Sequence, residues 1–314
     1  MPNWQNNYQI KSDMMEDPKN ILITGGTGFI GGYLTEELMK QGHFLTIVTR
    51  SPKKYIEEQA SNQKFISWDD VDEVINSMDI VINLAGENLF GRWNESVKKR
   101  IYNSRINATR NIVDAIEKAE APPSLLISAS GVSIYGDHGD EVIDEDTPAA
   151  DNFLAQTCVD WEAEAKRAEQ FGVRIAIPRI GPVLQHDGGL VSIMKLPFAL
   201  FLGGPVGSGD QYIPWIHMSD MCNALLFPIG NEDFSGPYNA NSPTPETMSN
   251  FTHIFGSVMN RPSFFKVPEF AVKLVLGEGA QPALESLRVQ PKKLQKAGFT
   301  FEYEDLEAAL ADIL

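Results

Sequence analysis

A short apolar strand that runs straight into a glycine-rich turn is the feature that most narrows what this chain can fold into. Residues 21–23 read Ile-Leu-Ile, and Thr24-Gly25-Gly26-Thr27-Gly28-Phe29-Ile30-Gly31 follows before apolar residues recur at helical spacing as far as residue 41. Glycines spaced in this way permit a tight turn, the close approach of a pyrophosphate to the backbone, and packing of the helix on the strand. The pattern favours a dinucleotide-binding turn over a glycine-rich turn without a ligand.

The rest of the chain continues the alternation of strands and helices. Such continuous apolar strands, separated by helices, indicate the α/β class: a Rossmann-type doubly wound parallel sheet covered on both faces, with a smaller C-terminal substrate lobe. We predict strands at residues 44–48, 64–68, 80–84, 124–128 and 173–178, and helices at 29–41, 100–118 and 160–170. The pattern divides the chain into a flexible N-terminal tail (1–18), a Rossmann domain (19–240, with substrate-lobe insertions from 181) and a small C-terminal domain (241–314).

Charge and cysteine content exclude several classes of protein. The chain has 26 Lys and Arg against 42 Asp and Glu, a formal net charge of −16, which argues against nucleic acid and against an anionic membrane surface as partners. Its two cysteines, Cys158 and Cys222, rule out a disulfide framework and fit a reducing compartment. Without a signal peptide or a membrane span in the pattern, we expect a cytoplasmic protein, monomeric or homodimeric. The histidines show no metal-ligand spacing, so no metal site is expected.

The end of the second strand bears on the choice of cofactor. NAD-specific sites usually place an acidic residue there, about 20 residues past the glycines, to bind the ribose diol. Here the strand ends in Thr49-Arg50-Ser51. Lys53 and Lys54 follow, and the first acidic residue after the strand is Glu57. A guanidinium pairs with a 2′-phosphate and stacks on adenine, so NADP(H) is favoured over NAD(H). The alternative is that these basic residues only form a solvated loop.

Further motifs resemble those of a known superfamily. Asn83-Leu84-Ala85-Gly86, Asn107-Ala108-Thr109, and Ser128-Ala129-Ser130 with Ile134-Tyr135-Gly136 resemble segments of the extended and atypical short-chain dehydrogenase/reductases. Gly86-Glu87-Asn88, Asp160-Trp161-Glu162 and Pro214-Trp215-Ile216-His217 resemble its epimerase-family, or sugar-nucleotide epimerase, subgroup, which carries a small C-terminal domain of unknown function. The resemblance extends over residues 20–314 and implies the Rossmann fold described above.

The resemblance also implies which residues meet the cofactor. Arg105 is assigned to the phosphates, with an ordinary surface arginine as the alternative, and Asn107 is similar to the asparagine that stabilises the centre of the sheet. Val183 is assigned to the cofactor site as well. The remaining positions are Gly25, Thr27, Gly28, Phe29, Ile30 and Gly31 for the pyrophosphate, Thr49 and Arg50 for the 2′-phosphate, and Leu84, Ala85 and Gly86 beneath the cofactor and against its adenosine half.

The chain departs from the superfamily at its acid/base pair. Members use Tyr-x-x-x-Lys, in which the tyrosine exchanges a proton and the lysine lowers the pKa of that tyrosine. Aligned on Glu162, the tyrosine position holds Leu154 and the lysine position holds Cys158, and neither residue can do this chemistry. Ser130 keeps the position that polarises the substrate. Candidate substitutes for the missing acid/base are Tyr135 and His217, with Glu87 and Cys158 as weaker alternatives.

Two functions remain open from the sequence. The first is an NADP(H)-binding epimerase- or reductase-like enzyme that transfers hydride to or from a small polar substrate, with sugar nucleotides suggested by the resemblance. The second is a non-catalytic NADP(H)-binding sensor or regulatory module, which the missing Tyr-x-x-x-Lys pair favours. A substrate pocket could draw on the aromatic residues Trp93, Tyr135, Trp161 and Trp215, although we expect Trp161 to belong to the core.

Overall fold

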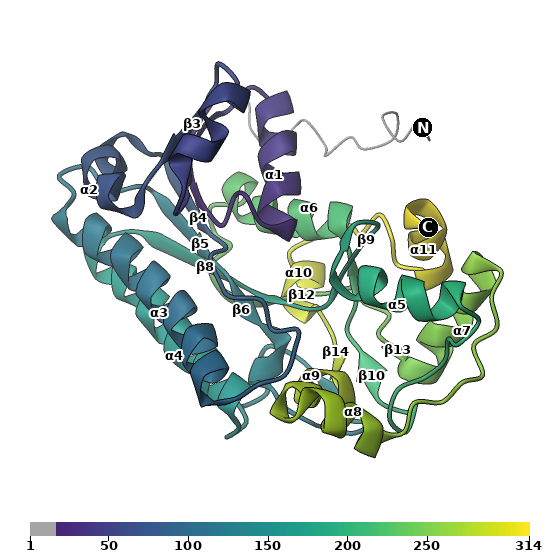
Figure 1. Cartoon of the computed structure of the whole chain (residues 1–314). Coiled ribbons are helices and arrows are strands. Elements are labelled where there is room, and N and C mark those ends of the chain that lie inside the picture. Colours follow the sequence, from purple (N-terminus) through teal and green to yellow (C-terminus); the bar gives the residue numbers. More distant parts are fainter. Residues whose placement is uncertain (1–16) are drawn as a thin grey trace.

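The computed structural model describes residues 17–314 and has a parallel sheet at its centre (Figure 1). The strand order is β12-β8-β5-β4-β1-β2-β3, with the short β6 also paired to β8. The order reverses between β1 and β4, which is where open α/β sheets bind ligands. The predicted α/β fold class is confirmed. The bounds are β1 (Asn20–Thr24), β2 (Phe44–Val48), β3 (Gln63–Ile66), β4 (Ile80–Asn83), β5 (Leu125–Ser128), β6 (Ser130–Gly131), β8 (Arg174–Ile180) and β12 (Gly236–Ala240).

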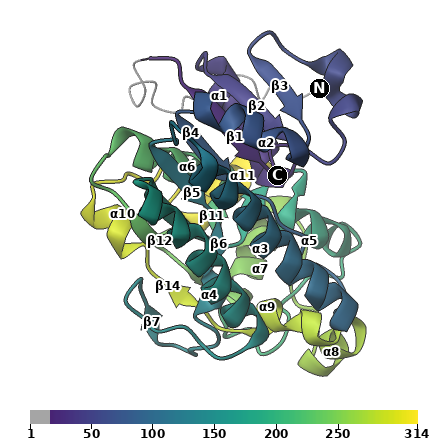
Figure 2. The same ribbon diagram turned by 90° about the vertical axis from the view of Figure 1, so that its left-hand side faces the viewer.

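Helices cover both faces of the sheet. On one face α1 (Phe29–Lys40) and α6 (Met218–Gly230) bury a core that includes Ile21 and Ile23 of β1. On the other face α2 (Val71–Val74) and α3 (Glu95–Lys118) cover a core built on Leu22 and Val81, and Figure 2 shows α4 (Phe153–Lys166) side by side with α3. Alternate residues of one strand therefore face opposite cores, which explains why the strands are apolar throughout.

Two helices begin earlier than the sequence pattern predicts. The helix predicted from residue 100 begins at Glu95, because the Oδ1 of Asn94 accepts a hydrogen bond from the N–H of Val97 (2.9 Å). The helix predicted from residue 160 begins at Phe153, because Asn152 caps it through Ala155 N–H (2.9 Å). The second shift places residues 154 and 158 on a helix beside the end of the sheet.

The region beyond β8 forms a smaller lobe from short elements. Residues Leu294, Phe299 and Phe301 return from this lobe into the core beneath α6, so the C-terminal region packs directly on the sheet. The helices are α5 (Gly189–Ala199), α7 (Met248–Met259), α8 (Glu269–Leu276), α9 (Gln281–Leu284), α10 (Lys292–Lys296) and α11 (Leu306–Ile313). The paired short strands are β7 (Val142–Ile143) with β14 (Arg288–Val289), β9 (Val183–Gln185) with β11 (Ile216–His217), and β10 (Tyr212–Ile213) with β13 (Glu246–Thr247).

Two of the expectations concern the N-terminal tail and membrane-spanning helices. The tail expected at residues 1–18 lies, apart from its last two residues, outside the described residues. Within residues 17–314, no helix has both the length and the apolar character needed to cross a bilayer.

Candidate functional site

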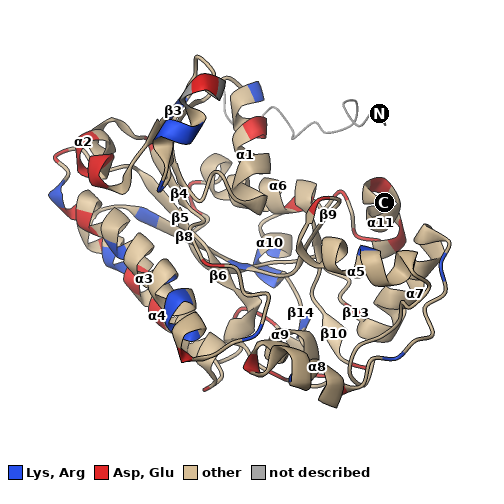
Figure 3. Ribbon diagram, viewed as in Figure 1, with Lys and Arg blue, Asp and Glu red and all other residues tan. Residues whose placement is uncertain are grey.

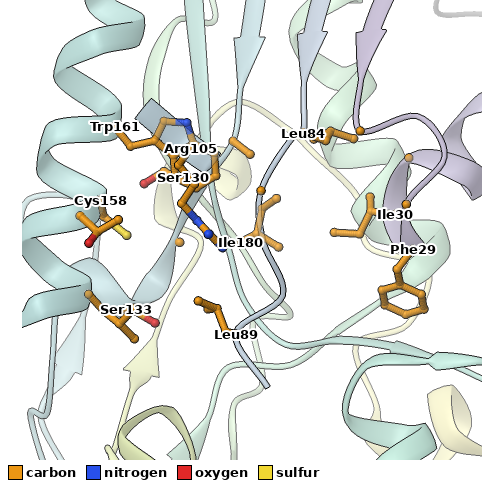
Figure 4. Close-up of a pocket in the computed structure, with 18 residues that line it drawn as sticks. Phe29, Ile30, Leu84, Leu89, Arg105, Ser130, Ser133, Cys158, Trp161 and Ile180 are labelled. Carbon is orange, nitrogen blue, oxygen red and sulfur yellow. The ribbon is translucent and has the colours of Figure 1, made fainter. Parts of the chain in front are cut away.

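A cavity of about 360 Å³ lies where β1, β4 and β5 end. Figure 4 shows Ser130, Ser133 and Cys158 on one side of it and Phe29 and Ile30 on the other. The cavity therefore joins the glycine turn to the segment that follows β5. Of the residues assigned to the cofactor, those that line it are Gly25, Gly28, Phe29, Ile30, Gly31, Leu84, Gly86 and Arg105.

The glycine turn leaves no room for side chains at two positions. Gly25 has a φ of +71°, and a Cβ built there would stand 2.7 Å from the carbonyl oxygen of Leu84. A Cβ on Gly31 would stand 2.2 Å from the carbonyl oxygen of Gly25. The turn is closed by a 2.9 Å hydrogen bond from Gly28 N–H to the same Gly25 oxygen. The start of α1 can therefore offer bare backbone N–H groups to an anionic ligand.

Asn83, at the end of β4, ties together the strands beneath the cavity. Its Oδ1 accepts a 2.6 Å hydrogen bond from Thr24 Oγ1, and its Nδ2 donates to Thr109 Oγ1 (2.8 Å) and Ser128 Oγ (3.1 Å). The assignment of this role to Asn107 is wrong, because Asn107 is exposed on the outer face of α3. Three side chains from β1, β5 and α3 instead converge on Asn83, which is fully buried.

Ser130 lines the cavity and is held from below by a carboxylate. Its Oγ donates a 2.9 Å hydrogen bond to Glu162 Oε1, and both side chains are buried. A carboxylate only accepts hydrogen bonds, so the serine proton points away from the cavity and the Oγ lone pairs remain for a ligand. In this arrangement Ser130 accepts from a ligand hydroxyl or amide. To polarise a carbonyl, it must first release Glu162.

Glu162 is fixed in turn by a buried arginine from β8. Arg179 donates to Glu162 through Nε (2.8 Å to Oε1) and through a terminal guanidinium nitrogen (3.0 Å to Oε2), which makes a bidentate ion pair. The other terminal nitrogen of Arg179 donates to the hydroxyl of Tyr135 (2.9 Å), which donates to Asn239 Oδ1 (2.6 Å). This chain of buried partners orients Ser130.

Tyr135 and His217, the two candidate acid/base residues, do not line the cavity. Burial raises the pKa of Tyr135 to about 12, and its hydroxyl is taken up by Arg179 and Asn239. His217 is fully buried at the start of α6, where its Nδ1 accepts from Ser219 N–H (3.1 Å) and its Nε2 lies 3.3 Å from Asp312 Oδ2. Neither side chain is placed to exchange a proton with a ligand in the cavity, so neither is part of the proposed site.

The two weaker alternatives for proton transfer differ in position. Glu87 does not line the cavity; it is partly buried and lies 3.4 Å from Arg100 Nε. Cys158 does line the cavity, as does Leu154 one turn earlier on α4. Burial raises the pKa of the Cys158 thiol to about 11, although the nearby Arg105 opposes the rise. A thiol with a raised pKa is a poor nucleophile at neutral pH.

Arg105 is the one charged side chain among the cavity-lining residues of the described chain. Its guanidinium carbon lies 5.2 Å from the centre of the Trp161 ring, and one terminal nitrogen donates to the Ile101 carbonyl oxygen (3.0 Å). No carboxylate among residues 17–314 forms an ion pair with it, and burial lowers its pKa. A partly buried cation that forms no ion pair favours an anionic ligand. Trp161 is buried, as expected, yet its ring also borders the cavity.

Five of the assigned cofactor residues lie outside the cavity wall. Thr49 and Arg50 follow β2 at the same edge of the sheet, and Arg50 is exposed, with no ion-pair partner in the part of the chain described. Ala85 follows Leu84, and its N–H donates to Thr24 Oγ1 (3.3 Å). The other two are Thr27, which is exposed in the turn, and Val183, which is buried at the start of β9.

The sequence reasoning missed the roles of Glu162 and Arg179. Arg179 follows the apolar run Ile175-Ala176-Ile177-Pro178 within β8, and a charged residue inside such a run signals a buried partner. The sequence alone could not identify Glu162 as that partner, because α4 and β8 come together only in the folded chain. Trp93 and Trp215, also considered for the pocket, are buried and lie outside the cavity wall.

Two family models match most of the chain. A model of the NAD dependent epimerase/dehydratase family matches residues 21–240, and a model of a domain of unknown function (DUF1731) matches residues 267–313. The first match spans well over half of the chain and contains the glycine turn, Asn83, Ser130 and α4. The chain belongs to the NAD dependent epimerase/dehydratase family.

Individual relatives are similar along nearly their whole length. The epimerase family protein YfhF of Bacillus subtilis is 37% identical over 300 residues, covering 94% of this chain and 98% of YfhF. The chloroplastic SDR39U1 homolog of Arabidopsis thaliana, also an epimerase family protein, is 37% identical, covering 100% of this chain and 92% of that protein. The crystal structure of human epimerase family protein SDR39U1 (isoform 2) with NADPH superimposes with a TM-score of 0.85 at 34% identity, covering 94% and 98% of the two chains.

Proposed function

We propose that this protein binds NADP(H) across the cavity and transfers hydride to or from a small polar substrate, with sugar nucleotides as the first class to test. The observation that carries the proposal is that one cavity contains both a glycine turn without room for side chains and Ser130 held by a buried ion pair. The human relative crystallised with NADPH supports the choice of cofactor, as does Arg50 after β2.

The residues present fit a nicotinamide cofactor. Gly25, Gly28 and Gly31 would receive the pyrophosphate, Arg105 would meet its charge, and Arg50 would pair with the adenosine 2′-phosphate. When bound, such a cofactor supplies a hydride donor or acceptor. The apolar wall formed by Leu89, Leu154 and Ile180 would exclude water from the reacting atoms.

One part of the chemistry would fall to the protein's own residues. Ser130 would accept a hydrogen bond from a substrate hydroxyl, and Glu162, fixed by Arg179, would keep the serine in that orientation. Leu154 and Cys158 cannot take the role of the tyrosine and lysine, so the substrate proton does not leave by the usual route of the superfamily.

The proposal is tested by turnover. Purified protein is incubated with NADPH or NADP⁺ and a panel of sugar nucleotides and small carbonyl compounds, and the absorbance of NADPH is followed. We expect Ser130→Ala to lower kcat by about 100-fold or more, since an oriented hydrogen-bonding group at the reacting atoms is removed. Ser133→Ala, which changes another serine of the same cavity, should stay within about threefold of the parent protein.

Two outcomes would contradict the proposal. One is turnover that Ser130→Ala leaves unchanged. The other is tight NADPH binding without turnover of any compound in the panel, accompanied by a change in stability or oligomeric state. That second result would identify a nucleotide sensor, the alternative that Leu154 and Cys158 favour.

A further inference from the structure

Exposed apolar side chains are concentrated in two segments of the small lobe. Of the fifteen large hydrophobic residues exposed among the described residues, eleven lie within 193–202 and 264–275. They include Leu196 and Phe201 in the first segment and Phe264, Phe270 and Leu274 in the second, all more than half exposed. Soluble monomers seldom expose apolar residues in such a group without an interaction partner. We call these two segments together the apolar band.

Main-chain hydrogen bonds join the two segments into one surface. Phe265 N–H donates to Gly203 O (3.0 Å), and Val267 N–H donates to Pro205 O (2.8 Å). The guanidinium of Arg261 lies 4.8 Å from the centre of the Phe201 ring. In Figure 1 the connection between α7 and α8 follows the outer edge of the lobe.

Packing inside the lobe does not account for the exposed side chains. In α5 the residues that face the core are Val191 and Phe198, whereas Leu196 is 66% exposed. In α8 the buried residue is Val272, whereas Phe270 and Leu274 are each 73% exposed. Both helices therefore carry a second apolar face, which a surface helix of a globular domain replaces with polar residues.

The charge of the apolar band is opposite to that of the whole chain. The apolar band contains three basic residues, Lys195, Lys266 and Lys273, and one acidic residue, Glu269, and Arg261, which contacts Phe201 of the band, lies just before its second segment. Glu269 is paired with Lys273 (2.5 Å). Figure 3 shows blue segments on the connection between α7 and α8. The net charge of −16, which argues against an anionic surface as a partner of the whole molecule, does not describe this face.

We propose that the apolar band docks on the surface of a lipid bilayer that contains anionic lipids. Its Phe and Leu side chains would enter the boundary between headgroups and acyl chains, and its Lys and Arg side chains would meet the lipid phosphates. A second copy of the chain fits less well, because a two-fold interface sets the same basic patch against itself. The acidic remainder of the molecule would face away from the membrane.

The test is co-sedimentation of the full chain with vesicles. Vesicles of phosphatidylcholine alone are compared with equimolar phosphatidylcholine and phosphatidylglycerol, at low and high salt. One variant combines Phe264→Ser with Phe270→Ser, and a second combines Lys266→Glu with Lys273→Glu. The control combines Phe44→Ser with Val142→Ser, two hydrophobic residues outside the band that are also more than half exposed. Thermal unfolding and NADPH titration confirm that each variant is folded.

We expect binding to the anionic vesicles only, weakened by salt. Each band variant should reduce the partition coefficient by about tenfold or more, and the control should leave it unchanged. Absence of vesicle binding, or binding that the band variants leave unchanged, would overturn the proposal. It would also be overturned by a concentration-dependent dimer that the band variants dissociate, since the band would then join two copies of the chain.

Discussion

At Gly31 the turn meets α1 so closely that a methyl group has no room. Gly31→Ala would place its Cβ 2.2 Å from the Gly25 oxygen, so the turn must open. We expect a loss of about 1–3 kcal/mol in the free energy of unfolding and a large loss of NADPH affinity. Gly32→Ala is the matched control, because its Cβ has no neighbour closer than 3.9 Å and alanine favours the helix by up to about 1 kcal/mol. Urea unfolding of both variants measures the difference, and equal free energies of unfolding for Gly31→Ala and Gly32→Ala would contradict the prediction.

At Cys158 the prediction concerns pH. A pKa of about 11 leaves the thiol protonated throughout the neutral range, and only the thiolate reacts with iodoacetamide. We expect alkylation of Cys158 at pH 8 to be about 100-fold slower than that of an ordinary exposed thiol, and its rate to rise with pH up to about 11. Peptide mass spectrometry distinguishes Cys158 from Cys222. Rapid labelling that saturates near pH 7 would contradict this and would restore Cys158 as a nucleophile.

The residue-level features of the site were only partly predictable from sequence. The roles of Gly25 and Gly31 followed from the local glycine pattern, but only the close contact of Gly31 with the Gly25 oxygen lies within the turn, whereas Gly25 meets the Leu84 oxygen after β4. The pairing of Ser130, Glu162 and Arg179 depends on three separate elements, and no local signal names the partners. The pattern likewise could not show that Tyr135 and His217 are enclosed by the core.

Among the elements, α4 matters most to the site, because it carries Leu154, Cys158 and Glu162. Asn152→Ala removes its cap, and we expect a loss of about 1 kcal/mol in the free energy of unfolding together with weaker NADPH binding, since the first turn borders the cavity. Thr247→Ala removes the cap of α7, whose residues do not line the cavity. It should cost similar stability and leave NADPH affinity unchanged. Unfolding and fluorescence titrations test the pair, and equal effects of both variants on NADPH binding would contradict the argument.

Helix boundaries were harder to predict than helix identity. The long run of apolar spacing identified α3, but its first turn, Glu95-Ser96-Val97-Lys98, is mostly polar and depends on the Asn94 cap. The same holds for α4, whose early start follows from the Asn152 cap. Caps are single side-chain contacts, and asparagine is equally common in turns, so the pattern alone did not separate the two roles.

For the whole molecule, the parallel sheet followed from alternating apolar strands and helices, because each strand must be covered on both faces. The packing of the small lobe did not follow, since Leu294, Phe299 and Phe301 reach the core from a segment of short, irregular elements. A domain boundary at residue 241 therefore marks a change of pattern, while the core continues across it.

The central claim is that the cavity binds NADP(H) and that Arg50 selects it over NAD(H). The most direct measurement is a fluorescence titration of the parent protein, Arg50→Ala and Lys64→Ala with NADPH and with NADH. Lys64→Ala is the control, because it removes an exposed cation of β3, the strand paired with β2, opposite Thr46. We predict that the parent prefers NADPH. Arg50→Ala should weaken NADPH binding by roughly 10- to 100-fold, which corresponds to the free energy of a hydrogen-bonded charge pair, and should leave NADH binding nearly unchanged. Lys64→Ala should bind both nucleotides nearly as the parent does. Equal binding of both nucleotides by the parent, or equal weakening of both by Arg50→Ala, would contradict the account.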